Sequence, residues 1–164
     1  MAKNPEAERQ SVVELVTLLL QERQRRLTNS NYSKENNNHI KYVLSHALLW
    51  KYTEAEGHKY KKCRYWSEGA VNSFKRHGDI ITNRNICGGE ALQHEHLFPL
   101  KQLIDKLFVI SDPTEIKVKE LLSKLNIAVI VTIDEHKLLH KFEGDENNPW
   151  TRYEKAGIKV VKRF

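Results

Sequence analysis

The sequence has few cysteines and no long apolar run. Cys63 and Cys87 are the only cysteines in 164 residues. Two cysteines exclude a disulfide framework and a four-cysteine zinc site, so a bound metal must rely on histidines and carboxylates. The apolar stretch from Val12 to Leu20 is broken by Glu14, and it is far shorter than the roughly 20 residues that cross a membrane. We therefore expect a cytoplasmic protein with no transmembrane helix and no secretory signal.

The composition is that of a folded, basic domain. Hydrophobic residues make up 40% of the chain, which is enough for a packed core. Lys and Arg number 27 against 21 Asp and Glu, so the net charge is +6 and the sequence pI is about 9.3. This excess favours a polyanionic partner such as nucleic acid.

Two segments concentrate the positive charge. Four cations and three aromatic residues lie between His58 and Trp66 without an acid, and five cations accompany Glu154 between Arg152 and Arg163. Such segments can hold phosphates and stack on bases. The predicted nucleic-acid-binding residues are Lys59, Lys61, Lys62, Arg64, Arg152, Lys155, Lys159, Lys162 and Arg163. The alternative is that both segments are solvated faces whose aromatic residues turn into the core.

The spacing of apolar residues predicts a mainly helical α+β fold. The expected helices cover 5–27, 40–56, 66–76, 101–108, 112–124 and 133–142. Extended segments are expected over 80–86, 91–98 and 126–132, with a loop over 29–38 and a helix end at Gly57. Capping boxes are expected at 112–115 and 132–135, so the last strand passes directly into the last helix.

Four of the eight histidines stand in two places along the predicted elements. His94 and His96 are at the end of a strand, and His136 and His140 are one turn apart on the following helix, on the same helix face. Glu95 adds a carboxylate beside an imidazole, as a site needs when one residue binds a metal and its neighbour acts as a base. The alternative for the helical pair is that it binds no ligand.

Two zinc enzymes with short histidine motifs do not fit. A zincin requires Glu directly after the first histidine of the helical pair, where this chain has Lys137. A zinc-dependent deaminase requires a Cys-x-x-Cys pair, which the sequence lacks.

The arrangement resembles the HNH, or ββα-metal, family of nucleases. The residues that carry the resemblance, in chain order, are Glu95, His96, Pro99, Asn126, His136 and His140. They cover about residues 90 to 142, and the resemblance implies a short two-stranded hairpin, interrupted here by helices, and a following helix. The chain departs from the family pattern in having Glu95 where Asp is usual and in lacking a four-cysteine zinc site.

The resemblance also implies a role for each of these residues. His96 would be the general base that activates water, and Asn126 would orient it. Glu95, His136 and His140 would hold one divalent cation, with Mg²⁺ or Mn²⁺ expected first and Zn²⁺ or Ni²⁺ as alternatives. Asn126 could instead simply end a helix or open a strand, and His94 is expected beside the site as an ordinary strand residue or a phosphate contact.

These observations predict three parts and one function. The parts are a helical N-terminal part (1–85), an HNH-like catalytic unit (86–145) and a basic C-terminal segment (146–164). The function that the HNH resemblance implies is hydrolysis of phosphodiester bonds in double-stranded DNA, leaving 5′-phosphate and 3′-hydroxyl ends, as in restriction or phage defence. A homodimer is expected if both strands are cut. The alternatives are a non-catalytic nucleic-acid-binding protein with a structural zinc and an RNA-cleaving, toxin-like nuclease.

Overall fold

The computed structural model describes residues 4–28, 34–55 and 59–163. The fold is α+β and mainly helical, as expected. The predicted helix end at Gly57 and the first residue of the basic segment, His58, lie outside the described residues. None of the helices in the described ranges is long and apolar enough to cross a membrane.

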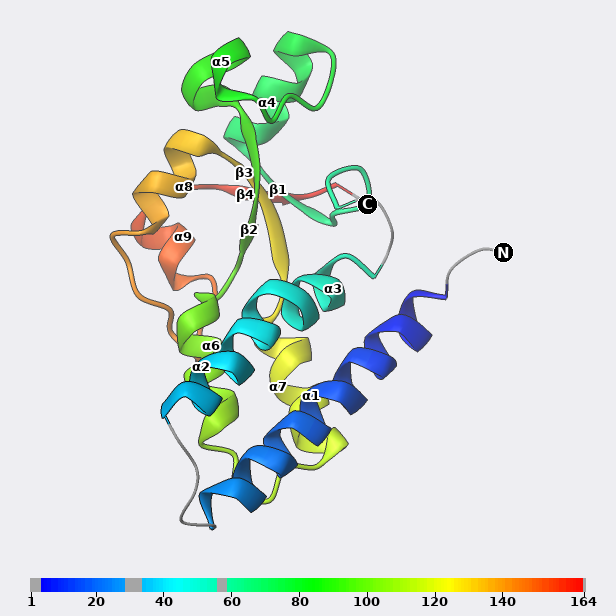
Figure 1. The fold of residues 1–164 in the computed structure, drawn as a ribbon. Coiled ribbons are helices and arrows are strands. Elements are labelled where there is room, and N and C mark those ends of the chain that lie inside the picture. The colour runs from blue at the N-terminus through cyan, green and yellow to red at the C-terminus, as the bar shows by residue number, and fades with distance from the viewer. Residues whose placement is uncertain (1–3, 29–33, 56–58, 164) are drawn as a thin grey trace. The chain divides into compact units, whose positions relative to one another are not determined.

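The structure has short strands and helices of very different lengths (Figure 1). The helices are α1 (Pro5–Leu27), α2 (Lys34–Val43), the π-helical turn η1 (Leu44–Leu48), α3 (Leu49–Thr53), α4 (Glu68–His77), α5 (Arg84–Cys87), the 3-10 turn η2 (Gly88–Glu90), α6 (Leu100–Phe108), α7 (Glu115–Leu125), α8 (Ile133–Leu139) and α9 (Thr151–Lys155). The strands are β1 (Tyr65–Ser67), β2 (Leu92–His96), β3 (Ala128–Thr132) and β4 (Val160–Lys162).

The chain forms two compact units. The helical unit comprises Met1–Gly57 and Leu100–Asn126, and the sheet unit comprises His58–Pro99 and Ile127–Phe164. This division differs from the three parts expected from the sequence. The helices between the two strands join the N-terminal helices, whereas β1 and α4, which were assigned to the N-terminal part, belong to the sheet unit.

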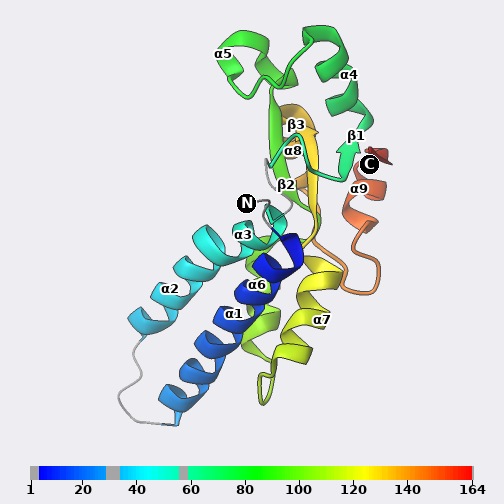
Figure 2. The same ribbon diagram turned by 90° about the vertical axis from the view of Figure 1, so that its right-hand side faces the viewer.

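The helical unit begins with α1, whose bounds agree with the predicted helix. Asn4 caps it by accepting hydrogen bonds from the backbone of Glu6 and Ala7, and Pro5 fills the first turn, where no backbone donor is needed. The buried stripe consists of Val12, Val13, Val16, Thr17 and Leu20. In Figures 1 and 2, α1 runs beside α7, which packs against it.

The second helix starts earlier than predicted. Helix α2 begins at Lys34, inside the Asn-rich stretch that was expected to be a loop. Arg23 Nε of α1 donates to Asn37 Oδ1 at 2.9 Å. This tertiary contact gives the asparagine side chain a partner that does not compete with the helix backbone.

The sheet unit has four strands in the order β2-β3-β1-β4. Strands β2 and β3 are antiparallel neighbours, with Leu92 opposite Thr132 and His96 opposite Ala128. Strand β1 is parallel to β3 and antiparallel to β4. The extended segments expected over 91–98 and 126–132 therefore do pair, but within a larger sheet whose β1 and β4, of three residues each, were not predicted.

Helices cover both faces of this sheet. One apolar cluster joins Trp66, Leu92, Ala128 and Ile130 to Ala70 and Phe74 of α4. The other joins Val129 and Val131 to Leu139 of α8 and Tyr153 of α9. All five residues of β3 are buried, as its continuous apolar run predicted.

Two local predictions were wrong. The segment 80–86 was expected to be extended, but α5 begins at Arg84 with Asn83 as its cap. Asp112 was expected to cap α7, but it has a φ of 50°, and Thr114 is the cap. An N-cap residue is normally extended, as Thr114 is with a φ of −114° and a ψ of 158°, and the positive φ of Asp112 does not fit that role.

Candidate metal site and nucleic-acid surface

Helix α8 is fixed to the sheet at its first turn by the predicted capping box. Thr132 Oγ1 accepts from the backbone of Glu135 at 3.2 Å, and Glu135 Oε2 accepts from the backbone of Thr132 at 2.8 Å. Ser67 Oγ, at the end of β1, donates to the same carboxylate at 2.6 Å. These bonds tie α8 to β1 and β3, so the side chains one turn further along have a defined position.

The three predicted metal ligands, Glu95, His136 and His140, come together on the side of the sheet that α8 covers. Glu95 Oε2 lies 2.6 Å from His136 Nδ1, and His136 Nε2 lies 2.9 Å from His140 Nε2. The Gln93 amide nitrogen, two residues before Glu95 on β2, lies 3.3 Å from His136 Nε2. Glu95 and His136 are mostly buried, whereas His140 is exposed.

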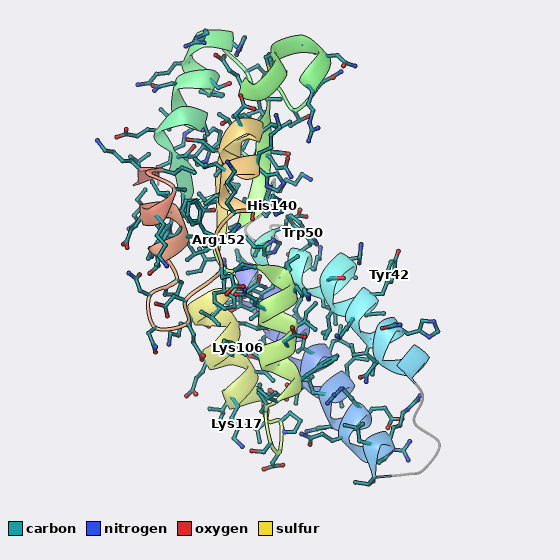
Figure 3. The ribbon with its side chains drawn as sticks, turned by 90° about the vertical axis from the view of Figure 1, so that its left-hand side faces the viewer. Tyr42, Trp50, Lys106, Lys117, His140 and Arg152 are labelled. Atoms are coloured by element: carbon teal, nitrogen blue, oxygen red, sulfur yellow. The ribbon has the colours of Figure 1, made fainter. Side chains whose placement is uncertain are left out.

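Arg152 of α9 reaches the same carboxylate from inside the unit. It is 2% exposed, and its Nη2 lies 3.3 Å from Glu95 Oε1, while Nη1 donates to the backbone carbonyl of His96 at 3.2 Å. Figure 3 labels Arg152 on α9 and His140, the residue that directly follows α8. The sequence suggested a phosphate contact for Arg152, but the structure places its guanidinium in the interior, at the end of β2.

His96 and Glu95 lie on opposite faces of β2, because side chains alternate along a strand. The rings of His94 and His96 are 6.0 Å apart in an edge-to-face arrangement, and the ring of His94 also meets that of Tyr60. Both histidines are buried. Burial, with a smaller contribution from nearby Lys59, lowers the pKa of His94 to about 4, so this imidazole is neutral near pH 7.

Asn126 belongs to the helical unit. It is the residue that ends α7, and its side-chain nitrogen donates to the carbonyl of Leu49 at 3.0 Å. Strand β3 begins two residues later, at Ala128. Ending a helix is thus the role that the structure displays for Asn126. Orienting His96 stays a prediction.

The side chains of Glu95, His136, His140 and Gln93 form a cluster whose donor atoms can be compared with the ligands that a divalent cation requires. Two imidazole nitrogens as close as those of His136 and His140 can bind one ion, and a neighbouring side-chain amide can add an oxygen. Among the described residues, no three His, Cys, Asp or Glu side chains are grouped so that one ion could contact them all. The donor set therefore fits a cation held by two histidines with positions left for other ligands.

The two basic segments meet at one edge of the sheet, because β4 pairs with β1. Arg64 and Lys162 flank this pairing, and the described surface there carries the exposed side chains of Lys59, Lys61, Lys62, Arg64, Lys159 and Lys162. Trp66 is fully buried, and the guanidinium of Arg163 lies 4.2 Å from its ring centre. For Trp66, the interpretation as a core residue is therefore confirmed.

No known protein family, curated protein or solved structure matches this chain.

Proposed function

We propose that this protein is a metal-dependent nuclease that hydrolyses phosphodiester bonds, with DNA as the substrate. The observation that carries the proposal is the contact between Glu95 at the end of β2 and His136 on α8. It occurs in an antiparallel strand pair followed at once by a helix, which is the order that the HNH resemblance implies.

The arrangement of the basic residues supports a nucleic-acid substrate. The exposed lysines and arginines gather along the β1–β4 edge, and β2, which carries Glu95, forms the opposite edge of the sheet. Neighbouring strands are about 4.8 Å apart, so the two edges are separated by about 14 Å. This distance is smaller than the width of a DNA duplex. A bound duplex could therefore contact both edges of the sheet.

Each part of the site has a separate task in the proposal. A divalent cation bound at the cluster would supply Lewis-acid stabilisation of the phosphate. The exposed lysines and arginines along the β1–β4 edge, here called the basic edge, hold neighbouring phosphates. His96 accepts the proton of the attacking water. His96 is assigned this role because of the resemblance. The role requires its buried ring, which lies on the face of β2 opposite Glu95, to become accessible to the phosphate bound at the metal.

An open ligand set favours catalysis over the structural-zinc alternative. A structural zinc site uses four protein ligands, whereas a catalytic site leaves a position for water or substrate. In the part of the chain that the structure describes, two imidazoles and one amide face each other, which is fewer than four.

Incubation with supercoiled plasmid tests the proposal directly. We expect nicked or linear products with at least one of Mg²⁺, Mn²⁺, Co²⁺ and Zn²⁺ and none in EDTA. The variant His136→Ala should lose cleavage, whereas Lys137→Ala, an exposed neighbour on the same helix, should retain it. Single-stranded RNA in a parallel reaction tests the toxin-like alternative.

Two results would contradict the proposal. One is intact plasmid with every metal tested at protein concentrations that bind the DNA. The other is cleavage that persists in EDTA or in His136→Ala at the wild-type rate.

A further inference from the structure

The neighbours of His136 divide between its two ring nitrogens. Glu95 Oε2 is at Nδ1, at 2.6 Å, whereas His140 Nε2 and the Gln93 amide nitrogen are at Nε2, at 2.9 and 3.3 Å. The two nitrogens of an imidazole point in widely different directions. One ion cannot therefore bind Nε2 of His136 and also replace the contact between Nδ1 and Glu95.

The contact with Glu95 selects one tautomer of His136. An ionised carboxylate can only accept a hydrogen bond, so the ring proton lies on Nδ1 and the lone pair on Nε2. Two groups, His140 and Gln93, then face this single lone pair, which can accept only one good hydrogen bond. A cation bound by the Nε2 lone pairs of both histidines would remove this competition.

Arg152 keeps Glu95 in this orientation. Its guanidinium is buried and binds both Glu95 Oε1 and the carbonyl of His96, at the end of the same strand. One carboxylate oxygen therefore faces Arg152 and the other faces His136. A metal-binding histidine is commonly held in its orientation by a carboxylate on its other ring nitrogen, and that carboxylate is itself hydrogen-bonded, as Glu95 is by Arg152.

We propose that Arg152 is a positioning residue: through Glu95 it holds His136 in the Nδ1-protonated form, so that a divalent cation binds Nε2 of His136 and His140 and Glu95 stays outside the ligand shell. The metal-binding half of this inference rests on the proposed function. It differs from the ligand set that the HNH resemblance implies, in which Glu95 binds the metal directly.

The ligands also define the class of cation. Imidazole nitrogen suits Zn²⁺, Co²⁺ and Ni²⁺, whereas Mg²⁺ prefers oxygen ligands and binds few nitrogen sites. The carbonyl oxygen of Gln93 is a further candidate ligand, since the two ends of an amide are interchangeable by rotation. We therefore expect the site to prefer borderline transition ions to Mg²⁺.

Imidazole NMR of the metal-free protein tests the role of Arg152. Long-range proton–nitrogen spectra, recorded at a pH where the rings are neutral, should show the Nδ1-protonated form of His136 in the wild type. In Arg152→Met the Nε2-protonated form should appear, because Glu95 is then free to turn away. Lys155→Met, an exposed cation on the same helix, is the matched control and should keep the wild-type form.

A Co²⁺ titration tests the ligand set. Affinity should fall about 10- to 100-fold in Arg152→Met, as for other outer partners of metal ligands. The visible bands of bound Co²⁺ should stay at the same positions in Glu95→Gln and should be lost in His136→Ala and His140→Ala. Excess Mg²⁺ should not displace Co²⁺ from the wild type.

The contradicting outcomes are distinct. A wild-type His136 that carries its proton on Nε2 overturns the inference even if Arg152→Met fails to fold. Shifted Co²⁺ bands in Glu95→Gln overturn the placement of Glu95 outside the shell, and displacement by Mg²⁺ overturns the class of cation. A wild-type protein that binds no divalent ion contradicts the proposed function itself.

Discussion

The backbone amide of Arg163 donates to the carbonyl of Arg64 at 2.8 Å. This hydrogen bond continues the pairing of β1 with β4 and joins two basic segments that are distant in the sequence. The exposed cations of both segments thus share one edge of the sheet and can act on the same polyanion.

Neutralising this edge should weaken binding to nucleic acid. We expect Lys59, Lys61 and Lys62 changed together to Ala to reduce affinity for all DNA sequences, because backbone phosphates carry no sequence information. The slope of log affinity against log salt should flatten by about 0.9 for each duplex phosphate that the variant no longer neutralises. Binding isotherms at several salt concentrations measure both effects.

The matched control removes the same charge elsewhere. Lys101, Lys119 and Lys124 are exposed residues of the helical unit, and their triple Ala variant should keep the wild-type slope. Equal slopes for both triple variants and the wild type would show that the basic edge is a solvated face without a binding role.

His96→Ala should abolish cleavage while metal binding persists. A general base contributes about 10²- to 10⁴-fold to the rate without being a ligand. His94→Gln is the control, because His94 is buried on the same face of β2. Single-turnover cleavage and Co²⁺ titration of both variants provide the comparison. Retained cleavage in His96→Ala would move the base elsewhere, with His94 as the first residue to examine.

Gly69→Ala should destabilise the protein, although alanine is normally the better helix residue. A Cβ at Gly69 would lie 2.5 Å from Glu135 Oε1, and Ser67 and the Thr132 backbone hold that carboxylate in place. Overpacking of this kind costs about 1–3 kcal/mol, which exceeds the gain of up to about 1 kcal/mol in helix propensity. Chemical denaturation measures the difference.

Gly89→Ala is the comparison for this prediction. Its Cβ would meet the carboxylate of Asp134 even more closely, but that side chain is 69% exposed and can rotate away. We expect a smaller loss of stability than for Gly69→Ala. Equal losses would show that the capping interactions of Glu135 do not restrain its carboxylate.

Tyr153→Phe should leave stability unchanged or raise it by about 1 kcal/mol. The hydroxyl of Tyr153 is buried and has no hydrogen-bond partner within the described residues, and removing an unsatisfied polar group relieves its desolvation cost. Burial raises the pKa of this phenol well above its usual value of 10, so the folded state keeps the proton that the unfolded chain loses. Wild-type stability should therefore fall as the pH rises above 10.

The phenylalanine variant should show less of this alkaline loss, because it has no phenol to ionise. Denaturation curves at neutral pH and at pH values above 10 provide the test. A Tyr153→Phe variant that is less stable than the wild type at neutral pH would indicate a hydrogen bond to the hydroxyl in solution.

Local signals predicted the parts of the fold that depend on local chemistry. Helix α1 and the direct connection from β3 through Thr132 to α8 were predicted, because helix caps and apolar spacing both depend on residues that are close together in the sequence. Strands β1 and β4 were missed, since three residues give no periodicity and their pairing is set by partners far along the chain.

The site was predicted only in part for a similar reason. The period of two along a strand could have shown that Glu95 and His96 face opposite sides of β2. The burial of Arg152 had no such signal, because a cation becomes an interior residue only when a carboxylate such as Glu95, distant in the sequence, lies beside it. A run of basic residues alone suggests a surface.

The helical insertion between β2 and β3 has a consequence for folding. The two strands can pair only after the chain from Leu97 to Ile127 has closed into a loop, which costs chain entropy. Helices α6 and α7 lie in that interval, and they form their compact unit with helices from the N-terminus. Assembly of the N-terminal helices on the insertion would draw the ends of the strands together. We therefore expect the pairing that brings Glu95 to its place to be a late event in folding, with slow rates typical of contacts distant in the sequence.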